Sequence, residues 1–404
     1  MSFNLLRNSR VFFTTAVGDT GAGLGVIGGA LAAGGNAAIS NTNTREIQVL
    51  DGFGFSQNTT SETVTLNETG ASPVRGQRSF NTQLDPVDFN MTTYIRPFQT
   101  ATPTVTAEES VLWNALFGTG AIGATGAAWT DGGSGTAAAT CVATNSNAHQ
   151  LQRFGLIVII DSACYLIDDC VLNTATIDFG IDAIASIQWA GQAKAIRPVA
   201  APTIGSGTFT GGDAVLAGTA FATKITTAAF IANKLSVLTV REGIGGSSGS
   251  YYNVPLTGGN LTISNNVSYL TPALLGQVNQ PVTYFAGTRA VSGSLTAYLR
   301  TGSADGTANT SNSSTGAKQT AQLLADMLAG SSTDVDPAYY VKIAIGGSSA
   351  NDRVELEMPG VVLTIPTIAT EQVISTTINF TAQGTAGGAF DLAQSNEINV
   401  KYYA

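Results

Sequence analysis

Residues 87–96 (VDFNMTTYIR) and residues 291–300 (VSGSLTAYLR) share one framework, 204 positions apart. Valine, threonine, tyrosine and arginine recur in register, and methionine/leucine and isoleucine/leucine are conservative pairs. In the first stretch Phe89, Met91 and Thr93 alternate with Asn90, Thr92 and Tyr94, which is the period of a half-buried strand. The pair predicts that one β-rich module occurs twice in the chain.

Three further pairs of segments follow in the same order. The matches are residues 46–50 with 234–238, residues 112–118 with 324–330, and residues 186–192 with 377–383. Their offsets are 188, 212 and 191 residues. Four collinear matches indicate a tandem duplication, and a duplication halves the number of chains needed to close a ring.

The changes of offset locate the insertions and predict the division of the chain. We expect an N-terminal arm, two modules and a linker between them, with loop insertions tolerated between preserved elements. The predicted bounds are 1–44 for the arm, 45–197 for module 1 with an insertion at 119–150, 198–230 for the linker, and 231–404 for module 2 with a loop insertion at 301–317.

Each module is predicted to hold several strands and one short helix. Thr106 to Glu109 reads as a capping box, in which the threonine oxygen accepts the Glu109 amide. An apolar face follows at helical spacing, and Gly118 is the expected C-cap. The second helix is expected over Ala317 to Ala329, ended by Gly330.

The composition is poor in charge. Only 11% of the 404 residues are charged, against about 25% in an ordinary domain. Such a chain is expected to bury much of its surface against copies of itself. A net charge of −9 argues against tight nucleic-acid binding, which needs lysine and arginine to neutralise phosphates.

No catalytic constellation can be assembled from the sequence. The single histidine, His149, lies in a Gly/Ala/Thr-rich stretch with no element to orient it. Gly23 to Gly28 matches GxGxxG formally. However, the glycines at 28–29 and 34–35 disfavour the helix that a dinucleotide site needs after this motif. We therefore expect no enzyme, no cofactor and no metal; the acidic residues at 161, 168, 169 and 178 fit no calcium loop.

The three cysteines, Cys141, Cys164 and Cys170, form no CxxC motif and have no nearby histidine. Buried thiols are the expectation, with a disulfide between the last two as the alternative. The N-terminus mimics a signal peptide only briefly, since Asp19 interrupts the apolar run. No stretch has the apolar length of a membrane span.

Two separated regions resemble the tail tube proteins of long-tailed bacteriophages. The first is Pro73 to Thr82 (PVRGQRSFNT), continued by Asp85 to Phe89 and Tyr94 to Pro97. The second runs from Ala175 (ATIDFGID) to Trp189. The resemblance covers most of module 1 and is fainter in module 2.

The resemblance implies a mainly β fold of two tandem β-sandwich modules, each with a flanking helix, contributing strands to a shared inner β-barrel. Six modules would form a ring, so three of these chains would make a pseudo-hexamer. Rings would stack into a hollow tube with the help of residues 67–77 and the N-terminal arm. The implied partners are other copies of the chain, a tape-measure protein and transiting DNA, with a sheath if the tail contracts.

The implied location is the tail of the virion, after synthesis in the host bacterial cytoplasm. Candidate contacts between subunits are charged residues near the resembling segments and their repeats: Arg75, Arg78, Asp85, Asp88, Arg96, Arg289 and Arg300. The alternative for these residues is ordinary surface or intramodule pairing. Two other functions stay open: a secreted β-sandwich surface assembly or adhesin, and a hydrolase or lectin domain.

Overall fold

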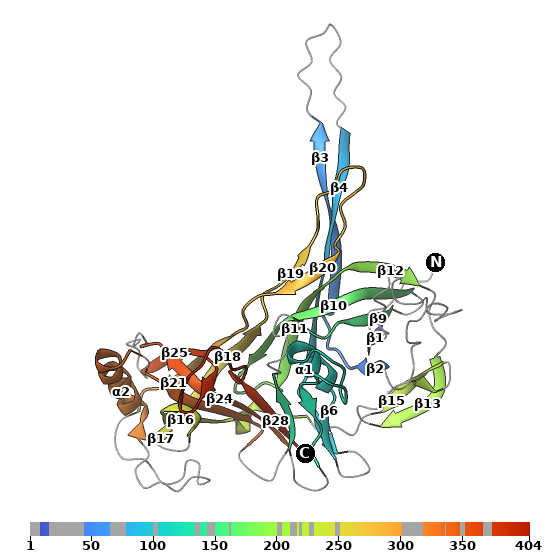
Figure 1. The fold of residues 1–404 in the computed structure, drawn as a ribbon. Helices are drawn as coiled ribbons and strands as arrows, with labels where there is room; N and C mark the ends of the chain where they lie inside the picture. Colours follow the sequence, from blue (N-terminus) through green and yellow to red (C-terminus); the bar gives the residue numbers. More distant parts are fainter. Residues whose placement is uncertain are drawn as a thin grey trace.

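A computed structural model describes the chain over residues 9–15, 44–64, 78–99, 104–133, 138–143, 150–160, 163–199, 204–210, 216–217, 220–225, 230–246, 251–300, 318–335, 337–347, 352–366 and 374–404. The fold is mainly β, as predicted (Figure 1). Several features expected from the sequence lie outside these residues, namely the glycine motif at 23–28, the loop at 67–76, Arg75, His149 and the insertion at 301–317.

The strands of the first half are β1 (Ser9–Thr14), β2 (Thr44–Ile47), β3 (Gly54–Val64), β4 (Arg78–Tyr94), β5 (Pro97–Gln99), β6 (Val105–Ala107), β7 (Trp129–Thr130), β8 (Ala139–Val142), β9 (Phe154–Ile160), β10 (Ala163–Asp178), β11 (Ser186–Ala193) and β12 (Ala195–Val199). The expected linker holds β13 (Ile204–Thr210), β14 (Leu216–Ala217) and β15 (Ala220–Ile225). The second half holds β16 (Val237–Glu242), β17 (Tyr251–Asn253), β18 (Leu256–Ser264), β19 (Val267–Leu270), β20 (Thr283–Ala286), β21 (Ala290–Tyr298), β22 (Lys318–Gln319), β23 (Tyr339–Ile345), β24 (Arg353–Leu363), β25 (Ser375–Ala382), β26 (Thr385–Ala386), β27 (Ala389–Phe390) and β28 (Asn399–Tyr403).

Two α-helices lie where the sequence predicts one per module, but their ends differ. Helix α1 spans Ser110–Phe117 and ends at Gly118, as expected. The predicted capping box is wrong, because Thr106 belongs to β6 and no side chain caps the helix. Helix α2 spans Thr320–Thr333 and continues through Gly330, which was expected to end it. The short 3-10 helices are η2 (Asn233–Leu235) and η3 (Ile244–Gly246).

Strands of both halves form one continuous sheet, which we call the central sheet. Its order is β3–β4–β11–β10–β18–β21–β25–β24, and every neighbouring pair is antiparallel. The first four strands come from the predicted module 1 and the last four from module 2. The two groups join where β10 pairs with β18 over five residues, from Thr174–Ser264 to Asp178–Asn260.

A second layer packs on one face of the central sheet in each half. In the first half its order is β2–β1–β9–β10–β12, and in the second half it is β17–β16–β23–β24–β28. The long strands β10 and β24 belong to both layers. In β10 the ladder shifts on both sides of Val171, and Asp169 takes a positive φ of 59°. Such irregularities bend a strand from one sheet into the next.

The repeated segments occupy equivalent rungs of the central sheet. Strand β4 pairs with β11 from Val87–Ala193 to Tyr94–Ser186. Strand β21 pairs with β25 from Val291–Ala382 to Tyr298–Ser375. Each ladder therefore begins at the repeated valine and ends at the repeated tyrosine. The sequence match of 186–192 with 377–383 is two residues out of register, since Ser375 occupies the rung equivalent to Ser186.

The first sequence match is also corrected by the pairing. Residues 234–238 enter β16, which pairs with β23, whereas residues 46–50 begin in β2, which pairs with β1. The strand that occupies the position of β16 in the first half is β1, which pairs with β9. Val11 and Phe13 of β1 are buried in the core. Part of the segment expected to be an arm is thus a core strand.

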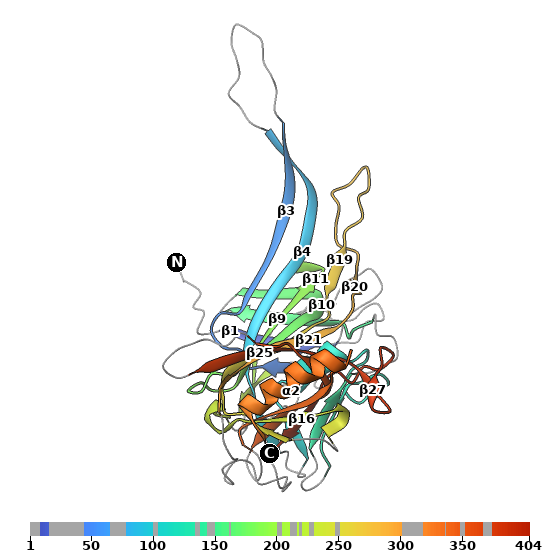
Figure 2. The same ribbon diagram turned by 90° about the vertical axis from the view of Figure 1, so that its left-hand side faces the viewer.

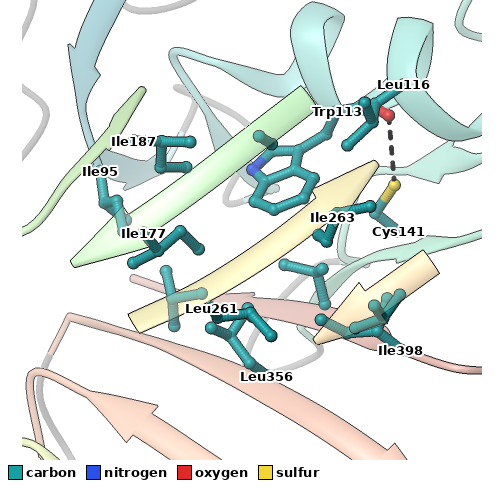
Figure 3. Packing of buried hydrophobic residues seen from close by; sticks show 14 of the residues in the cluster. Ile95, Trp113, Leu116, Cys141, Ile177, Ile187, Leu261, Ile263, Leu356 and Ile398 are labelled. Atoms are coloured by element: carbon teal, nitrogen blue, oxygen red, sulfur yellow. Dashed lines mark hydrogen bonds between the residues drawn. The ribbon is translucent and has the colours of Figure 1, made fainter. Parts of the chain in front are cut away.

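One hydrophobic core runs through both halves (Figure 3). Leu261 and Ile263 of β18 and Leu356 of β24 lie in the same cluster as Trp113 of α1 and Ile177 of β10. The core is built from alternate residues of each strand, because successive side chains point to opposite faces. The two halves are therefore not independent packing units.

The insertion at 119–150 forms a second connection between the halves. Its strands β7 and β8 pair with each other, and β8 pairs with β28 from Ala139–Tyr402 to Val142–Asn399. The second layer of module 2 is thereby extended by two strands from module 1. The segment was predicted only as a loop insertion. Its described part contains strands that connect the two halves by pairing with β28.

Among the described residues, neither helix has the length and apolarity needed to cross a bilayer.

Candidate assembly surfaces

The central sheet ends in two edges that no described strand covers. Strand β3 pairs with β4 on one side only. At the other end, Val362 and Leu363 of β24 pair with β25 on one side only. Unpaired edges are usually blunted by charge or proline. Strand β3 (GFSQNTTSETV) carries a single charge, Glu62, so its edge is open to pairing.

The junction of β10 with β18 inside the chain is a model for how such an edge can pair with another strand. Strands β3 and β18 are equivalent, because Phe55 lies opposite Phe89 in the first ladder and Leu261 lies opposite Gly293 in the second. Leu261 itself pairs with Ile177 of β10. The chain therefore contains one completed copy of this junction, and the equivalent of its β18 half recurs unpaired at β3.

A long hairpin of β3 and β4 projects from the body of the protein (Figures 1 and 2). Arg78, one of the predicted contact residues, lies at the outer end of its described part and is exposed. The Arg78 guanidinium stacks on the Phe80 ring at 4.7 Å. Phe80 is itself 46% exposed, so the pair presents a cationic and apolar surface far from the core.

Asp85 and Asp88 lie further along β4 and have partners within the chain. The Asp85 carboxylate accepts hydrogen bonds from Gln83 Nε2 at 2.8 Å and Thr60 Oγ1 at 3.2 Å. Asp88 is exposed and accepts a bond from Gln192 Nε2 at 3.2 Å. These bonds stabilise the hairpin base and leave lone pairs of both carboxylates available to other groups.

Arg96 differs from the other candidates because it is buried. Its guanidinium donates to Gln48 Oε1 and stacks on the Phe230 ring at 4.3 Å. Burial lowers its pKa, while Glu108 and Glu109 oppose this effect. These contacts of Arg96 lie within the same chain. They agree with intramodule pairing, which was the alternative to a contact between subunits. A role at a subunit interface stays a prediction for this residue.

Glu109 is a buried carboxyl whose contacts the sequence did not indicate beyond the capping box. Its carboxylate is buried, accepts the Arg96 backbone N–H at 3.3 Å and accepts the Tyr402 hydroxyl at 2.5 Å. The same hydroxyl accepts a bond from Trp113 Nε1 at 2.6 Å. Desolvation raises the pKa of Glu109 to about 7. This network ties α1 to β28 and so fastens module 1 to the last strand of module 2.

The two candidates from the second half also have partners within the chain. Arg289 forms an ion pair with Glu397 at 3.3 Å and stacks on Phe117 of α1 at 5.4 Å. The Arg300 carbonyl accepts the Ala321 N–H at 3.1 Å in the first turn of α2. The structure thus scatters the six described candidates over the molecule, and the seventh, Arg75, lies outside the described part.

The face of the central sheet that points away from the core is polar and carries few charges. We call it the polar face, defined by the outward residues of β4, β11, β10, β18, β21 and β25. It consists of Asp88, Asn90, Thr92, Tyr94, Ser186, Gln188, Ala190, Gln192, Thr174, Thr176, Asp178, Asn260, Thr262, Ser264, Ser292, Ser294, Thr296, Tyr298, Ser375, Thr377, Asn379 and Thr381. Its charges are two carboxylates, with no lysine or arginine among these residues.

Two of the three acidic residues of β10 are engaged in ion pairs. Asp168 pairs with Arg197 and Asp169 with Arg153. Within the described part of the chain, no group of acidic, histidine or cysteine residues could hold a metal ion. The expectation of buried thiols is confirmed: Cys141, Cys164 and Cys170 are free and buried. Burial raises the pKa of Cys164 to about 11.

The described residues form layered β-sheets with open strand edges and a polar face, and open edges of this kind are surfaces at which another chain can pair. No protein-family model matches the chain. The chain is 29% identical over 392 residues to the tail tube protein pb6 of Escherichia phage T5. The match covers 95% of this chain and 73% of that protein.

Proposed function

We propose that this chain is a structural subunit of a phage tail tube, a non-enzymatic protein that assembles with copies of itself. The observation that carries the proposal is the junction of β10 with β18, which joins two similar sheets within one chain. The edge of β3, which is equivalent to β18, stays open, and Val362 and Leu363 of β24 are open at the other edge of the central sheet. The similarity to a tail tube protein over nearly the whole chain supports the same role.

The repeated ladders support a tandem duplication and a ring of three chains. Both ladders span eight rungs between the repeated valine and the repeated tyrosine, Val87 to Tyr94 and Val291 to Tyr298. If each open edge repeats the internal junction, every chain supplies two of six equivalent positions. Three chains then close a pseudo-hexameric ring whose inner wall is a shared β-barrel.

The polar face suits the wall of a conduit for DNA. Asp88 and Asp178 supply only negative charge there, so phosphates find no counter-charge to which they could bind. Serine, threonine, asparagine and glutamine give a hydrated surface, held by contacts such as Thr176–Thr262 at 3.3 Å and Thr296–Thr377 at 3.2 Å. Asp88 and Asp178 are our candidates for the carboxylates that line the lumen.

The remaining assignments follow from this role. Stacked rings would form the tube, which would hold a tape-measure protein before ejection and DNA during it. The subunit would be made in the host cytoplasm and function in the virion tail. A sheath would contact the outer surface in a contractile tail. Arg78 at the projecting hairpin is the predicted contact residue that is best placed for another subunit.

Electron microscopy of the purified chain, with a matched pair of variants, tests the proposal. Hollow rings with three-fold symmetry and six similar lobes are the expected end-on view. Ser56→Lys places a charge on the equivalent of the junction position Thr262 and should prevent ring closure. Ser61→Lys is the control, because it lies on the same strand beyond the equivalent of the junction. Six-fold rings of whole chains, or rings unaffected by Ser56→Lys, would overturn the three-chain arrangement.

A further inference from the structure

The β19–β20 hairpin continues from strands β18 and β21 of the central sheet and projects beside the β3–β4 hairpin (Figures 1 and 2). One of its faces is fixed to the body of the protein. Val267, Tyr269 and Ala286 are buried on that face. The Tyr269 hydroxyl donates to the Asp169 carbonyl, and the Tyr284 hydroxyl donates to the Leu151 carbonyl at 2.7 Å. The base of the hairpin is therefore held in one orientation.

The turn of the hairpin is braced against β4. The Leu84 N–H donates to the Asn279 carbonyl at 2.9 Å, and the Asn279 N–H donates to the Thr82 carbonyl at 3.1 Å. The Asn279 side chain accepts the Leu274 N–H at 2.8 Å, which shapes the turn. A segment held at both its base and its turn presents its outer side chains in a fixed arrangement.

Those outer side chains are apolar. They form what we call the apolar hairpin face: Leu270, Leu274, Leu275, Val278, Val282 and Phe285. Each side chain is at least 44% exposed, and that of Leu275 is fully exposed. No aspartate, glutamate, lysine or arginine occurs anywhere in residues 243–288. A rigid and uncharged apolar surface of this kind marks a site of association.

A second apolar surface lies at the other ends of these strands, away from the β19–β20 hairpin. We call it the apolar base patch: Ile181, Ile184, Phe230 and Leu235, which are 39 to 59% exposed. Its two loops are joined by bonds from the Ala185 N–H to the Ile231 carbonyl at 2.8 Å and from the Asn233 N–H to the Ala183 carbonyl at 3.0 Å. The charges on its surface are opposite in sign, since Asp182 and Lys234 lie 3.6 Å apart. The buried Arg96 guanidinium packs on the Phe230 ring at 4.3 Å, with Glu108 and Glu109 near it.

The strand directions place the two surfaces at opposite ends. Strand β18 runs from Asn260, opposite Asp178, to Ser264, opposite Thr174, and then continues into β19. The loop after Asp178 carries Ile181 and Ile184, so it lies at the end away from the hairpin.

We infer that the apolar hairpin face of one chain binds the apolar base patch of a second copy, placed head to tail along the strand direction. A contact between two different surfaces of one molecule repeats without closing. Copies with a net charge of −9 repel each other, and two surfaces without excess charge can associate despite this. The inference rests on the proposed function, in which it supplies the contact between stacked rings.

Cysteine pairs placed on the two surfaces test the inference directly. Leu275→Cys and Ile184→Cys chains are mixed at high concentration with a mild oxidant, and disulfide-linked dimers are measured on a non-reducing gel. The native thiols are buried, so their background is low. The control mixes Leu275→Cys with Val335→Cys, whose position after α2 is 95% exposed and lies on neither surface. We expect at least a ten-fold higher yield from the first pair, and equal yields would overturn the inference.

A second measurement separates this contact from ring formation. The double variant Leu274→Ser/Leu275→Ser should form rings that do not stack in electron micrographs, whereas Val335→Ser should behave as the unaltered chain does. Rings that stack normally in the double variant would overturn the inference and leave the proposed ring intact. Absence of rings from the unaltered chain, with the cross-link still specific, would reject the proposed ring and retain the head-to-tail contact.

Discussion

At the residue scale, the network of Glu109, Tyr402 and Trp113 has the most consequences. Its hydrogen bonds join side chains that are 289 to 293 residues apart. A buried carboxyl without a basic partner in direct contact keeps its proton more readily than one in water, because burial disfavours the charged form. The hydroxyl of Tyr402 reduces this effect by bonding to the carboxylate. Stability should therefore depend on pH through this one group.

We predict that Glu109→Gln removes part of the pH dependence of unfolding. The folded pKa of about 7 exceeds the value of about 4.3 in an unfolded chain. The unfolded state therefore loses its proton first, and stability is lost as the pH rises from about 4.5 to 7. The unaltered chain should lose about 2–3 kcal/mol relative to Glu109→Gln between pH 5 and pH 8.

Denaturant unfolding of both chains at the two pH values measures this difference. Taking the difference between the chains cancels the contribution of every other titrating group, provided that their environments are unchanged. A gap between the two chains that stays constant with pH would show that Glu109 does not titrate in this range.

At the scale of elements, the sequence predicts the strands of the central sheet better than the surrounding segments. The alternation of Phe89, Met91 and Thr93 is strong because one face of β4 is buried and the other is polar. The capping box failed because Glu109 is drawn into the core by residues of β28, which local sequence cannot reveal. Helix α2 passes Gly330 because tertiary packing outweighs the modest cost of one glycine.

The two-residue error in the repeat has a physical cause. A shift of two along a strand keeps every side chain on the same face, so the alternation of apolar residues cannot detect it. The true register is revealed by a cross-strand pair of phenylalanine and glycine. Phe89 lies opposite Gly191 in the first half, and Gly293 lies opposite Phe380 at the equivalent rung of the second. The two residue types have exchanged strands, which hides the equivalence.

We predict that these glycines are needed for the aromatic rings beside them. A Cβ at Gly191 would lie 2.3 Å from the Val171 carbonyl oxygen and 2.5 Å from Phe89 Cζ. One at Gly293 would lie 2.1 Å from the Asn260 carbonyl oxygen and 2.7 Å from Phe380 Cζ. Gly191→Ala and Gly293→Ala should each lower the free energy of unfolding by about 1–3 kcal/mol. Gly180→Ala is the control, since its nearest neighbour is 3.6 Å away. Equal stabilities of all three variants would contradict this account of the rungs.

At the scale of the whole molecule, the sequence predicted a mainly β fold but not the way its two halves are joined. The pairing of β8 with β28 involves an insertion present in one half alone, so no repeat could indicate it. The candidate contact residues were chosen by charge, and several proved to be engaged inside the chain. The exposed surfaces suited to association are instead open strand edges and apolar side chains. The amino-acid composition indicates these surfaces only through its low content of charged residues.

We predict that salt promotes association of the purified chain. Each copy carries a net charge of −9, and salt screens repulsion beyond about 10 Å at 0.1 M. Contacts through strand edges and apolar side chains lose little in salt. Sedimentation velocity between low and moderate ionic strength should show a larger assembled fraction as salt rises. A decrease would indicate that attraction between opposite charges dominates the interface, as the arginine and aspartate candidates would require.

The bond between Glu109 and Tyr402 also sets an order of events during synthesis. The two residues are separated by 293 positions, and a ribosome adding about 5–20 residues per second needs on the order of 15–60 s to cover that distance. Throughout this interval the Glu109 carboxyl has no access to Tyr402, and β8 has only β7 beside it, because β28 has not been made. Nascent chains therefore expose an incomplete first half until the second half has been translated, and only finished chains can compete for a place in a growing assembly.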